Sequence, residues 1–342
     1  MTGPGSGPAL GYADAAYARA LGEFGRPIAL PASGGWLLER PIPGATDLDA
    51  MGPYPLFACR DWSGLGQDLD TLRSRLVSVT LVADPFGDYD ESLLRDVFER
   101  VRPYKNHFVT DMAEPVDSIV SPHHRYYAHR ALKRVQIDVS RSPKAYADEW
   151  TRLYSGLVER HEIRGLRRFS AASFARQLRV PGVVLFRALR EGIAVGAQLW
   201  YEEGTGAAPA GAAQSGATQS GAAESSAAGG SRRDGVAYSH LAASSEAGYD
   251  VRVSYALYLA ALEYFRGRVR WLDLGAGAGV GDRQDGLTAF KRGWATGTRP
   301  VFLCSSVLRP ERYEVLAGAS SAVDDGYFPA YRAGEFAAKD AA

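Results

Sequence analysis

The second half of the chain opens with a helical pattern. Aromatic and aliphatic residues recur about every four positions after Ser142-Pro143, a pair that is typical of a helix start. This spacing predicts an amphipathic helix to about His161. Ser170 caps a second, shorter helix, which ends before Pro181-Gly182. The repeating positions of the first helix are Tyr146, Trp150, Tyr154 and Leu157.

Strand patterns follow these helices. Two β-rich runs, residues 183–189 and 193–201, are joined by Glu191-Gly192, which is typical of a hairpin turn. Residues 236–243 predict a third strand. A loop over residues 244–253 then leads to a helix marked by Tyr255, Leu257, Leu259, Leu262 and Phe265.

The chain then alternates between strand and helix. Residues 269–274 predict a strand, which is followed by a glycine-rich turn, a helix from about residue 284 to 292, and a last strand over 300–305. The second half of the chain therefore reads α-α-β-β-β-α-β-α-β.

The first half of the chain is less regular. Strand patterns cover residues 36–39, 54–58, 76–83 and 107–111, and helical patterns cover 64–72 and 91–101. We expect a flexible N-terminus over residues 1–30 and a C-terminal extension of weak periodicity over 311–342. Between them, we expect two α/β subdomains, over residues 31–134 and 135–310.

Residues 204–235 differ in composition from the rest of the chain. They are almost entirely Gly, Ala, Ser, Gln and Thr, and too few of them are apolar to offset the entropy of ordering the segment. Because strand patterns lie on both sides, we expect a disordered insertion at the tip of a hairpin.

Composition narrows the class of protein. Of 342 residues, 46% are hydrophobic and 23% charged, which excludes a disordered or fibrous protein. The net charge of +0 leaves any polyanion site to a local patch. Cys59 and Cys304 have no CxxC neighbour, so no disulfide framework or thiolate zinc site is expected. No apolar stretch approaches the roughly 18 residues of a membrane span. We expect a cytoplasmic protein.

The sequence Trp271-Leu-Asp273-Leu-Gly275-Ala-Gly277-Ala-Gly279 matches the cofactor loop of S-adenosylmethionine methyltransferases. Its position argues against that function, because such a loop opens its domain and needs most of a parallel sheet after it. No acidic residue follows between Gly286 and Pro310 to hold a ribose. We keep the methyltransferase as an alternative, together with a non-catalytic binding protein.

The order of elements is that of the acyltransferase fold called GNAT, and several segments resemble FemAB-like proteins of that superfamily. The most specific is Gly286-Leu-x-x-Phe290-Lys291-x-x-Trp294. The other similar segments are Tyr238-Ser-His240, Ser254-Tyr255, Leu272-Asp273-Leu-Gly275, Tyr54-Pro-Leu-Phe, Asp84-Pro85-Phe86 and Tyr104-Lys105-Asn-His107.

The resemblance implies a fold and a reaction. The fold is α/β (α+β), with two GNAT-like subdomains that each hold a mixed, mostly antiparallel sheet flanked by helices. The reaction is transfer of an acyl or aminoacyl group to an amine of a small molecule or peptide. It implies acyl-CoA or aminoacyl-tRNA as co-substrate, no permanently bound cofactor, and tRNA as a possible partner. The sequence says nothing of the oligomeric state.

Acyl transfer needs a base for the amine and positive charge for the oxyanion or leaving group. Lys291 lies between Phe290 and Trp294, so its charge can face the substrate, although a surface lysine with a buried stem fits too. His240 is a candidate base, or a buried histidine with satisfied hydrogen bonds. Tyr255 is a candidate proton donor, or a core residue.

Asp273 ends a strand and would orient a base or bind the amine; alternatively it caps the turn that follows. Around these four catalytic candidates we predict two groups of binding residues. The substrate-binding candidates are Lys105, His107, Asp84, Tyr238 and Tyr249. The donor-binding candidates are Arg252 and Phe290. Asp84 precedes Pro85 and is also explained as an ordinary turn residue.

Three features set limits on this interpretation. The GNAT pyrophosphate loop has no counterpart, since residues 244–252 hold one glycine and two acids, and acetyl-CoA as donor is therefore in question. His123, His124 and His129 lack a carboxylate or cysteine at ligand spacing, so a solvated basic stretch is favoured over a metal site. Arg160, Arg164, Arg167 and Arg168 would hold phosphates or form a solvated helix end.

Overall fold

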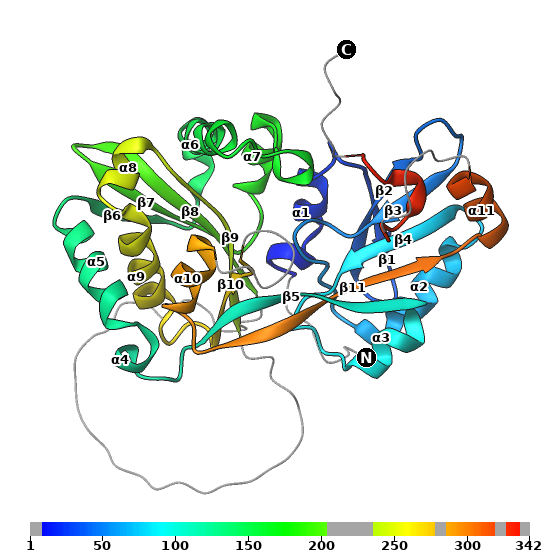
Figure 1. Cartoon of the computed structure of the whole chain (residues 1–342), viewed down its shortest axis with the longest axis horizontal. Coiled ribbons are helices and arrows are strands. Elements are labelled where there is room, and N and C mark those ends of the chain that lie inside the picture. Colours follow the sequence, from blue (N-terminus) through cyan, green and yellow to red (C-terminus); the bar gives the residue numbers. More distant parts are fainter. Residues whose placement is uncertain (1–8, 204–234, 278–284, 319–325, 336–342) are drawn as a thin grey trace, which may run out of the picture.

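The computed structural model describes residues 9–203, 235–277, 285–318 and 326–335. Its strands form one 11-stranded mixed sheet in the order β1-β2-β3-β4-β11-β5-β10-β9-β8-β7-β6 (Figure 1). The strands are β1 (Arg26–Leu30), β2 (Gly35–Pro41), β3 (Leu48–Met51), β4 (Leu76–Val82), β5 (Arg100–Asp111), β6 (Gln136–Ser140), β7 (Val183–Arg190), β8 (Ile193–Glu203), β9 (Val236–Ser244), β10 (Trp271–Gly275) and β11 (Gly297–Val307). We call β1 to β4, β11 and β5 the N-terminal half-sheet, and β10 to β6 the C-terminal half-sheet.

Helices cover both faces of the C-terminal half-sheet, because its strands are apolar on both sides. In β7, Val184 and Phe186 face one core, and Val183 and Leu185 face the other. The first core contains α5 (Pro122–Leu132) and α9 (Val253–Phe265), and the second contains α1 (Ala15–Ala20), α6 (Ala147–Arg160) and α7 (Ala171–Gln177).

The N-terminal half-sheet has a helical cover of its own. Its core packs against α2 (Leu65–Leu72) and α3 (Glu91–Val97). The remaining α-helices are α4 (Val116–Ile119), α8 (Glu246–Asp250), α10 (Gly286–Arg292) and α11 (Pro310–Gly318). In the described ranges no helix is long and apolar enough to cross a bilayer.

The long strand β5 joins the half-sheets, because one of its edges pairs with β11 and the other with β10. β5 has 12 residues and β11 has 11, and they pair antiparallel from Gly297↔Val109 to Ser305↔Arg100. The other edge of β11 pairs with β4. The predicted C-terminal subdomain, 135–310, includes β11. In the structure, however, β11 forms its backbone hydrogen bonds with two strands of the N-terminal half-sheet, β4 and β5.

Most of the predicted pattern of the C-terminal half is confirmed, but the predicted loop over residues 244–253 contains helix α8, which Ser245 caps by accepting from the Gly248 amide. The helices after Ser142 and Ser170, the hairpin at Glu191-Gly192, and the strand-helix-strand order after residue 250 are all present. Residues 204–234 of the predicted insertion lie outside the described residues. Glu203 pairs with Val236, so the strands on its two sides form a hairpin as expected.

Four predictions for the first half need correction. Within residues 9–30, expected to be flexible, α1 and β1 form and Tyr17 is fully buried, because its ring packs in the second core. Residues 54–58 form a single bridge, Phe57↔Ala83, since Pro53 and Pro55 lack the amide hydrogens of a strand. The predicted helix 91–101 ends at Val97, and β5 begins at Arg100, well before the predicted residue 107.

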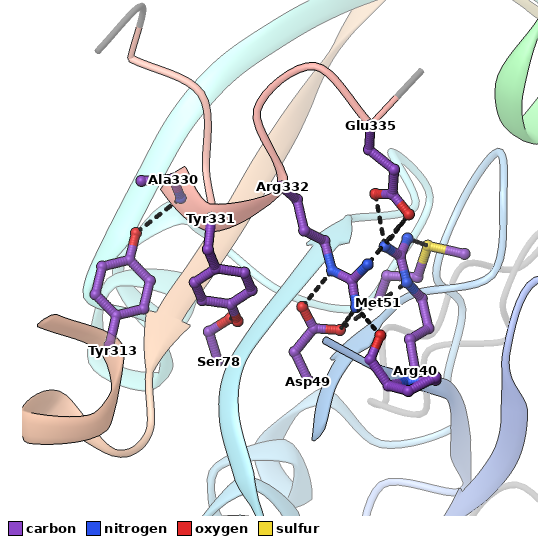
Figure 2. A network of polar contacts seen from close by, with 10 residues as sticks. Arg40, Asp49, Met51, Ser78, Tyr313, Ala330, Tyr331, Arg332 and Glu335 are labelled. Carbon is purple, nitrogen blue, oxygen red and sulfur yellow. Dashed lines mark hydrogen bonds and ion pairs between the residues drawn. The ribbon is translucent and has the colours of Figure 1, made fainter. Parts of the chain in front are cut away.

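The C-terminal segment returns to the N-terminal half-sheet. Residues 326–335, which we call the C-terminal strap, lie against the face opposite α2 and α3 (Figure 2). Arg332 donates to both carboxylate oxygens of Asp49 on β3, at 2.5 and 2.8 Å. Glu335 accepts from Arg40 on β2 at 2.6 Å. Arg332 and Asp49 are 5% and 3% exposed, so each is the other's main compensation for lost water.

Asp49→Asn therefore tests the attachment of the strap. The variant removes the buried counter-charge of Arg332 and leaves it only the partly exposed Glu335, so we expect a loss of about 3 kcal/mol in the free energy of unfolding. Urea denaturation measures the loss.

Asp47→Asn is the matched control. Asp47 pairs with Arg309 and Arg312, whose side chains are 39% and 37% exposed, so we expect a change within about 1 kcal/mol. Equal losses in the two variants would contradict the account.

Candidate active site

A buried histidine–carboxylate pair lies where the two half-sheets meet. Nδ1 of His107, on β5, is 2.8 and 3.0 Å from the carboxylate oxygens of Asp273, on β10. The antiparallel β5–β10 pairing, with Asp273 opposite Val109, brings them together. The Gly275 amide also donates to Asp273 at 2.7 Å and fixes its carboxylate.

This pairing sets the tautomer of His107. Because an ionised carboxylate only accepts hydrogen bonds, Nδ1 carries the proton and Nε2 is left as the acceptor. No described residue hydrogen-bonds Nε2. The arrangement is that of a carboxylate that orients a general base. The structure thus pairs two predicted site residues, and the histidine next to Asp273 is His107.

Lys291 extends from α10 towards the same carboxylate. Its ammonium donates to the Ala276 carbonyl oxygen at 2.6 Å. Burial lowers the pKa of Lys291 to about 8, although the charges of Asp273 and Asp285 oppose this shift; Lys105 lowers the pKa further. The residue is partly exposed along its stem, whereas the ammonium itself is desolvated. This geometry fits the inward-facing alternative of the sequence prediction.

Two further cations lie on the N-terminal side of this site. Lys105 is half-buried, and burial together with the charge of Arg167 lowers its pKa. The Lys105 ammonium is 5.3 Å from the centre of the Tyr104 ring. Burial raises the pKa of Tyr54, and the charge of Arg167, from the basic run after α6, opposes this rise. One arginine of that run therefore borders the site, which the sequence alone left open.

Asp84 and Tyr238 form a second buried pair. The Tyr238 hydroxyl donates to the two carboxylate oxygens of Asp84 at 3.0 and 2.9 Å. Burial and the charge of Asp84 raise the pKa of Tyr238. Asp84 also accepts from the Phe86 amide at 3.0 Å, as its predicted turn role requires. The structure thus joins two predicted substrate-binding residues from the two half-sheets.

The base role predicted for His240 is not supported. Its Nδ1 accepts from the Tyr12 hydroxyl at 3.0 Å, and its Nε2 lies 3.1 Å from Oε1 of Gln177. Burial lowers the pKa of His240 to about 3, so the ring is neutral at physiological pH. With both nitrogens engaged, His240 is the buried, satisfied histidine of the alternative interpretation.

Tyr255 and Phe290 belong to an aromatic cluster. Their ring centres are 4.9 Å apart, and both rings contact His124 and Trp294. Burial raises the pKa of Tyr255, and the charge of Arg252 opposes this rise.

The charge of Asp273 acts on Tyr258, which lies one helical turn after Tyr255 in α9. Burial raises its pKa to about 12, with a further increase from the charge of Asp273. The sequence pattern missed Tyr258 because it lies within a helix that is apolar on every side; the signal available was a hydroxyl among aliphatic residues.

The other two predicted binding residues have different neighbours. Tyr249 on α8 is exposed, and the Arg160 guanidinium lies 4.3 Å from its ring centre. Arg252 precedes α9 with a left-handed backbone, φ 56°, and stacks 3.8 Å from the Tyr127 ring centre. Tyr127 is on α5 and was not predicted.

In the histidine-rich stretch, His123, His129 and Arg130 are exposed as the predicted solvated stretch requires, and only His124 needs correction. The stretch forms α5, in which His124 is buried and its nitrogens lie 2.7 Å from Ser121 Oγ and 2.8 Å from the Phe290 carbonyl oxygen. It is therefore a packed helix, since α5 covers one face of the C-terminal half-sheet. No three potential ligands group into a metal site within the part of the chain that the structure describes.

Comparisons with known proteins agree with this architecture. No family model and no curated protein matches the sequence. The crystal structure of FemX aligns over 88% of this chain and 93% of its own, with a TM-score of 0.59 and 14% identity. This chain has the FemX fold. The predicted fold is therefore confirmed.

Two lysylphosphatidylglycerol synthetase structures are also similar to the chain. The C-terminal domain of a putative enzyme from Agrobacterium fabrum gives a TM-score of 0.53 at 11% identity and covers 85% of this chain and 88% of that one. L-PGS from Bacillus licheniformis gives 0.53 at 13% identity, with coverages of 89% and 94%. Identities this low establish the fold alone.

The methyltransferase alternative is wrong in its structural premise. β10 is antiparallel to β5 and parallel to β9 in a mixed sheet, so Gly275 does not open a doubly wound parallel domain. Asp273 contacts His107, whereas that motif needs backbone amides directed at a cofactor. Gly279 lies outside the described residues.

His240→Leu separates the two histidines. The variant leaves the Tyr12 hydroxyl and the Gln177 amide oxygen without partners, so we expect the free energy of unfolding to fall by about 1–3 kcal/mol. Once a transfer assay exists, turnover per folded molecule should match the unsubstituted protein. Lost turnover at unchanged stability would restore His240 as a catalytic residue.

Proposed function

We propose that this protein is an acyltransferase that moves an acyl or aminoacyl group from acyl-CoA or aminoacyl-tRNA to an amine of a small molecule or peptide. The observation that carries the proposal is the His107–Asp273 pair with the Lys291 ammonium beside it. The fold shared with FemX and the L-PGS domains supports it. In this proposal the donor is a co-substrate, the protein holds no permanent cofactor, and it acts in the cytoplasm.

His107 acts as the general base. Its Nε2 takes a proton from the amine as the new C–N bond forms at the donor carbonyl. Asp273 accepts from Nδ1, so it stabilises the imidazolium that results and keeps Nε2 directed away from it. The proton then passes to the leaving thiolate or ribose oxygen when the C–S or C–O bond breaks.

Lys291 supplies positive charge to the same step. The tetrahedral intermediate carries a negative oxygen, and a desolvated ammonium stabilises such a charge more strongly than a hydrated one does. Lys105 adds a second cation nearby, since its charge acts on Lys291. Tyr238 and Asp84 would lie on the acceptor side, where the Asp84 carboxylate would accept a hydrogen bond from the neutral amine before attack.

The donor would lie on the α9 and α10 side of the C-terminal half-sheet. There Arg252 stacks on Tyr127, close to the ring cluster of Tyr255 and Phe290. A guanidinium on an exposed aromatic face suits a phosphate and a nucleobase, the groups that CoA and the tRNA 3′ end share. Tyr249 with Arg160 extends this surface.

A donor panel tests the proposed reaction. The protein is incubated with acetyl-CoA, longer acyl-CoAs, aminoacyl-tRNA or S-adenosylmethionine and a mixture of amines, and mass spectrometry detects the products. We expect amide products from one acyl donor, and a loss of at least about 100-fold in His107→Gln. Methylated products would refute the proposal, and silence with every donor would favour the binding-protein alternative.

The pH dependence of transfer tests Lys291. Because its pKa is lowered to about 8, the ammonium is charged below that pH and neutral above it, so activity should fall as the pH rises through about 8. Lys291→Arg keeps its charge at all these values and should move the fall to higher pH. Lys291→Met should lower turnover at every pH. An unchanged profile in Lys291→Arg would remove Lys291 from the site.

A further inference from the structure

A cavity of about 420 Å³ lies between the C-terminal strap and the N-terminal half-sheet. Its walls come from β2 to β5, from the loop at residues 52–55, and from the strap itself. Figure 2 shows the strap residues that close it, Arg332 and Glu335, above Arg40 and Asp49. None of these residues has a role in the proposed reaction.

The cavity has more positive than negative charge. Arg40, Arg102 and Arg332 line it, against Asp49 and Glu335. Arg332 is engaged by Asp49 and the Pro41 carbonyl oxygen, and it also donates to Glu335 at 3.1 Å. The side chain of Arg102 forms no ion pair with a described residue and is exposed. One arginine of the cavity is thus available to an anion.

Arg40 is incompletely satisfied although it is 7% exposed. One terminal nitrogen donates to both oxygens of Glu335, and the other reaches only the sulfur of Met51, at 3.1 Å. A thioether is a weak acceptor for a guanidinium donor. Nε of Arg40 is 3.9 Å from Oδ1 of Asp49. The strong partner of Arg40 is therefore a carboxylate at the end of the strap.

The rest of the lining suits an apolar body. The rings of Tyr54, Tyr104 and Phe328 line the cavity, together with Leu81 and Leu303. Thr80 also lines it, and its buried hydroxyl oxygen has no hydrogen-bond partner among the described residues. A buried hydroxyl without a partner costs stability unless a ligand satisfies it.

We propose that this cavity binds a small molecule with an apolar body and a carboxylate or phosphate, which takes the place of Glu335 on Arg40 and also pairs with Arg102. Glu335 then holds the anion position in the unliganded protein. Tyr104 forms part of the wall and contacts the Lys105 ammonium. The idea that this ligand is the amine acceptor rests on the proposed function. The existence of the anion site does not depend on that function.

Matched probes test the site by calorimetry, with no need for activity. Phenylacetate and phenyl phosphate carry the two anions, and phenylacetamide is the neutral control. We expect the anions to bind at least about tenfold more tightly than the amide, because charged pairs with arginine are strong. Preference for one anion identifies the chemistry of the natural ligand.

Two variants assign the contacts. Glu335→Gln removes the competing charge and should tighten anion binding about threefold or more. Arg40→Met should abolish the preference over phenylacetamide; Arg73→Met, at an exposed arginine of the same half, is its control and should keep it. Equal binding of all three probes, or unchanged affinity in Glu335→Gln, would overturn the proposal.

The experiments distinguish a failure of the proposed anion site from a failure of the proposed acyltransferase function. Binding with the expected preference but no product from any donor would leave the cavity assigned and remove the acyltransferase. Product formation with no anion preference would support the acyltransferase and overturn the proposed anion site.

Discussion

The structure depends on the pairing between β5 and β11. β11 enters from the C-terminal part of the chain and fills the gap between β4 and β5, so its backbone is satisfied on both sides. β5 continues past β11 and pairs with β10. One strand therefore carries both the contact between the half-sheets and His107, and the candidate site exists only where that contact forms.

Burial gives the site its chemistry. Asp273, His107 and the Lys291 ammonium are removed from water, and each has a partner that offsets part of the cost. The remaining cost appears in the lowered pKa of Lys291, which makes its charge responsive near physiological pH. The same logic applies at Arg40, where a carboxylate from the C-terminal strap compensates a buried guanidinium. In both places a buried cation is stabilised by oxygen atoms of the protein itself.

Local patterns in the sequence predicted much of the fold. The hairpin at Glu191-Gly192 and the capped helices depend on neighbouring residues, so they could be inferred from short segments. The place of β11, the burial of Tyr17 and the α5 helix depend on distant partners, and periodicity does not encode them. Weak periodicity therefore predicted a flexible N-terminus, where the structure has α1 and β1.

The candidate site divides in the same way. Residue type and family resemblance identified Lys291, Asp273 and His107, but not which histidine faces the carboxylate. The strand register across β5 and β10 places Asp273 beside His107, whereas His240, on β9, lies beside Tyr12 and Gln177. Tyr258 was missed because it lies in an apolar helix, and Arg167 could not be singled out from a run of similar arginines.

The tautomer of His107 tests the central claim most directly. Nitrogen-15 NMR of histidine-labelled protein, assigned by comparison with His107→Gln, distinguishes a protonated Nδ1 from a protonated Nε2. The account predicts Nδ1–H with an unprotonated Nε2 at neutral pH, and loss of that preference in Asp273→Asn. A signal from Nε2–H in the unsubstituted protein would contradict the assignment of His107 as the base.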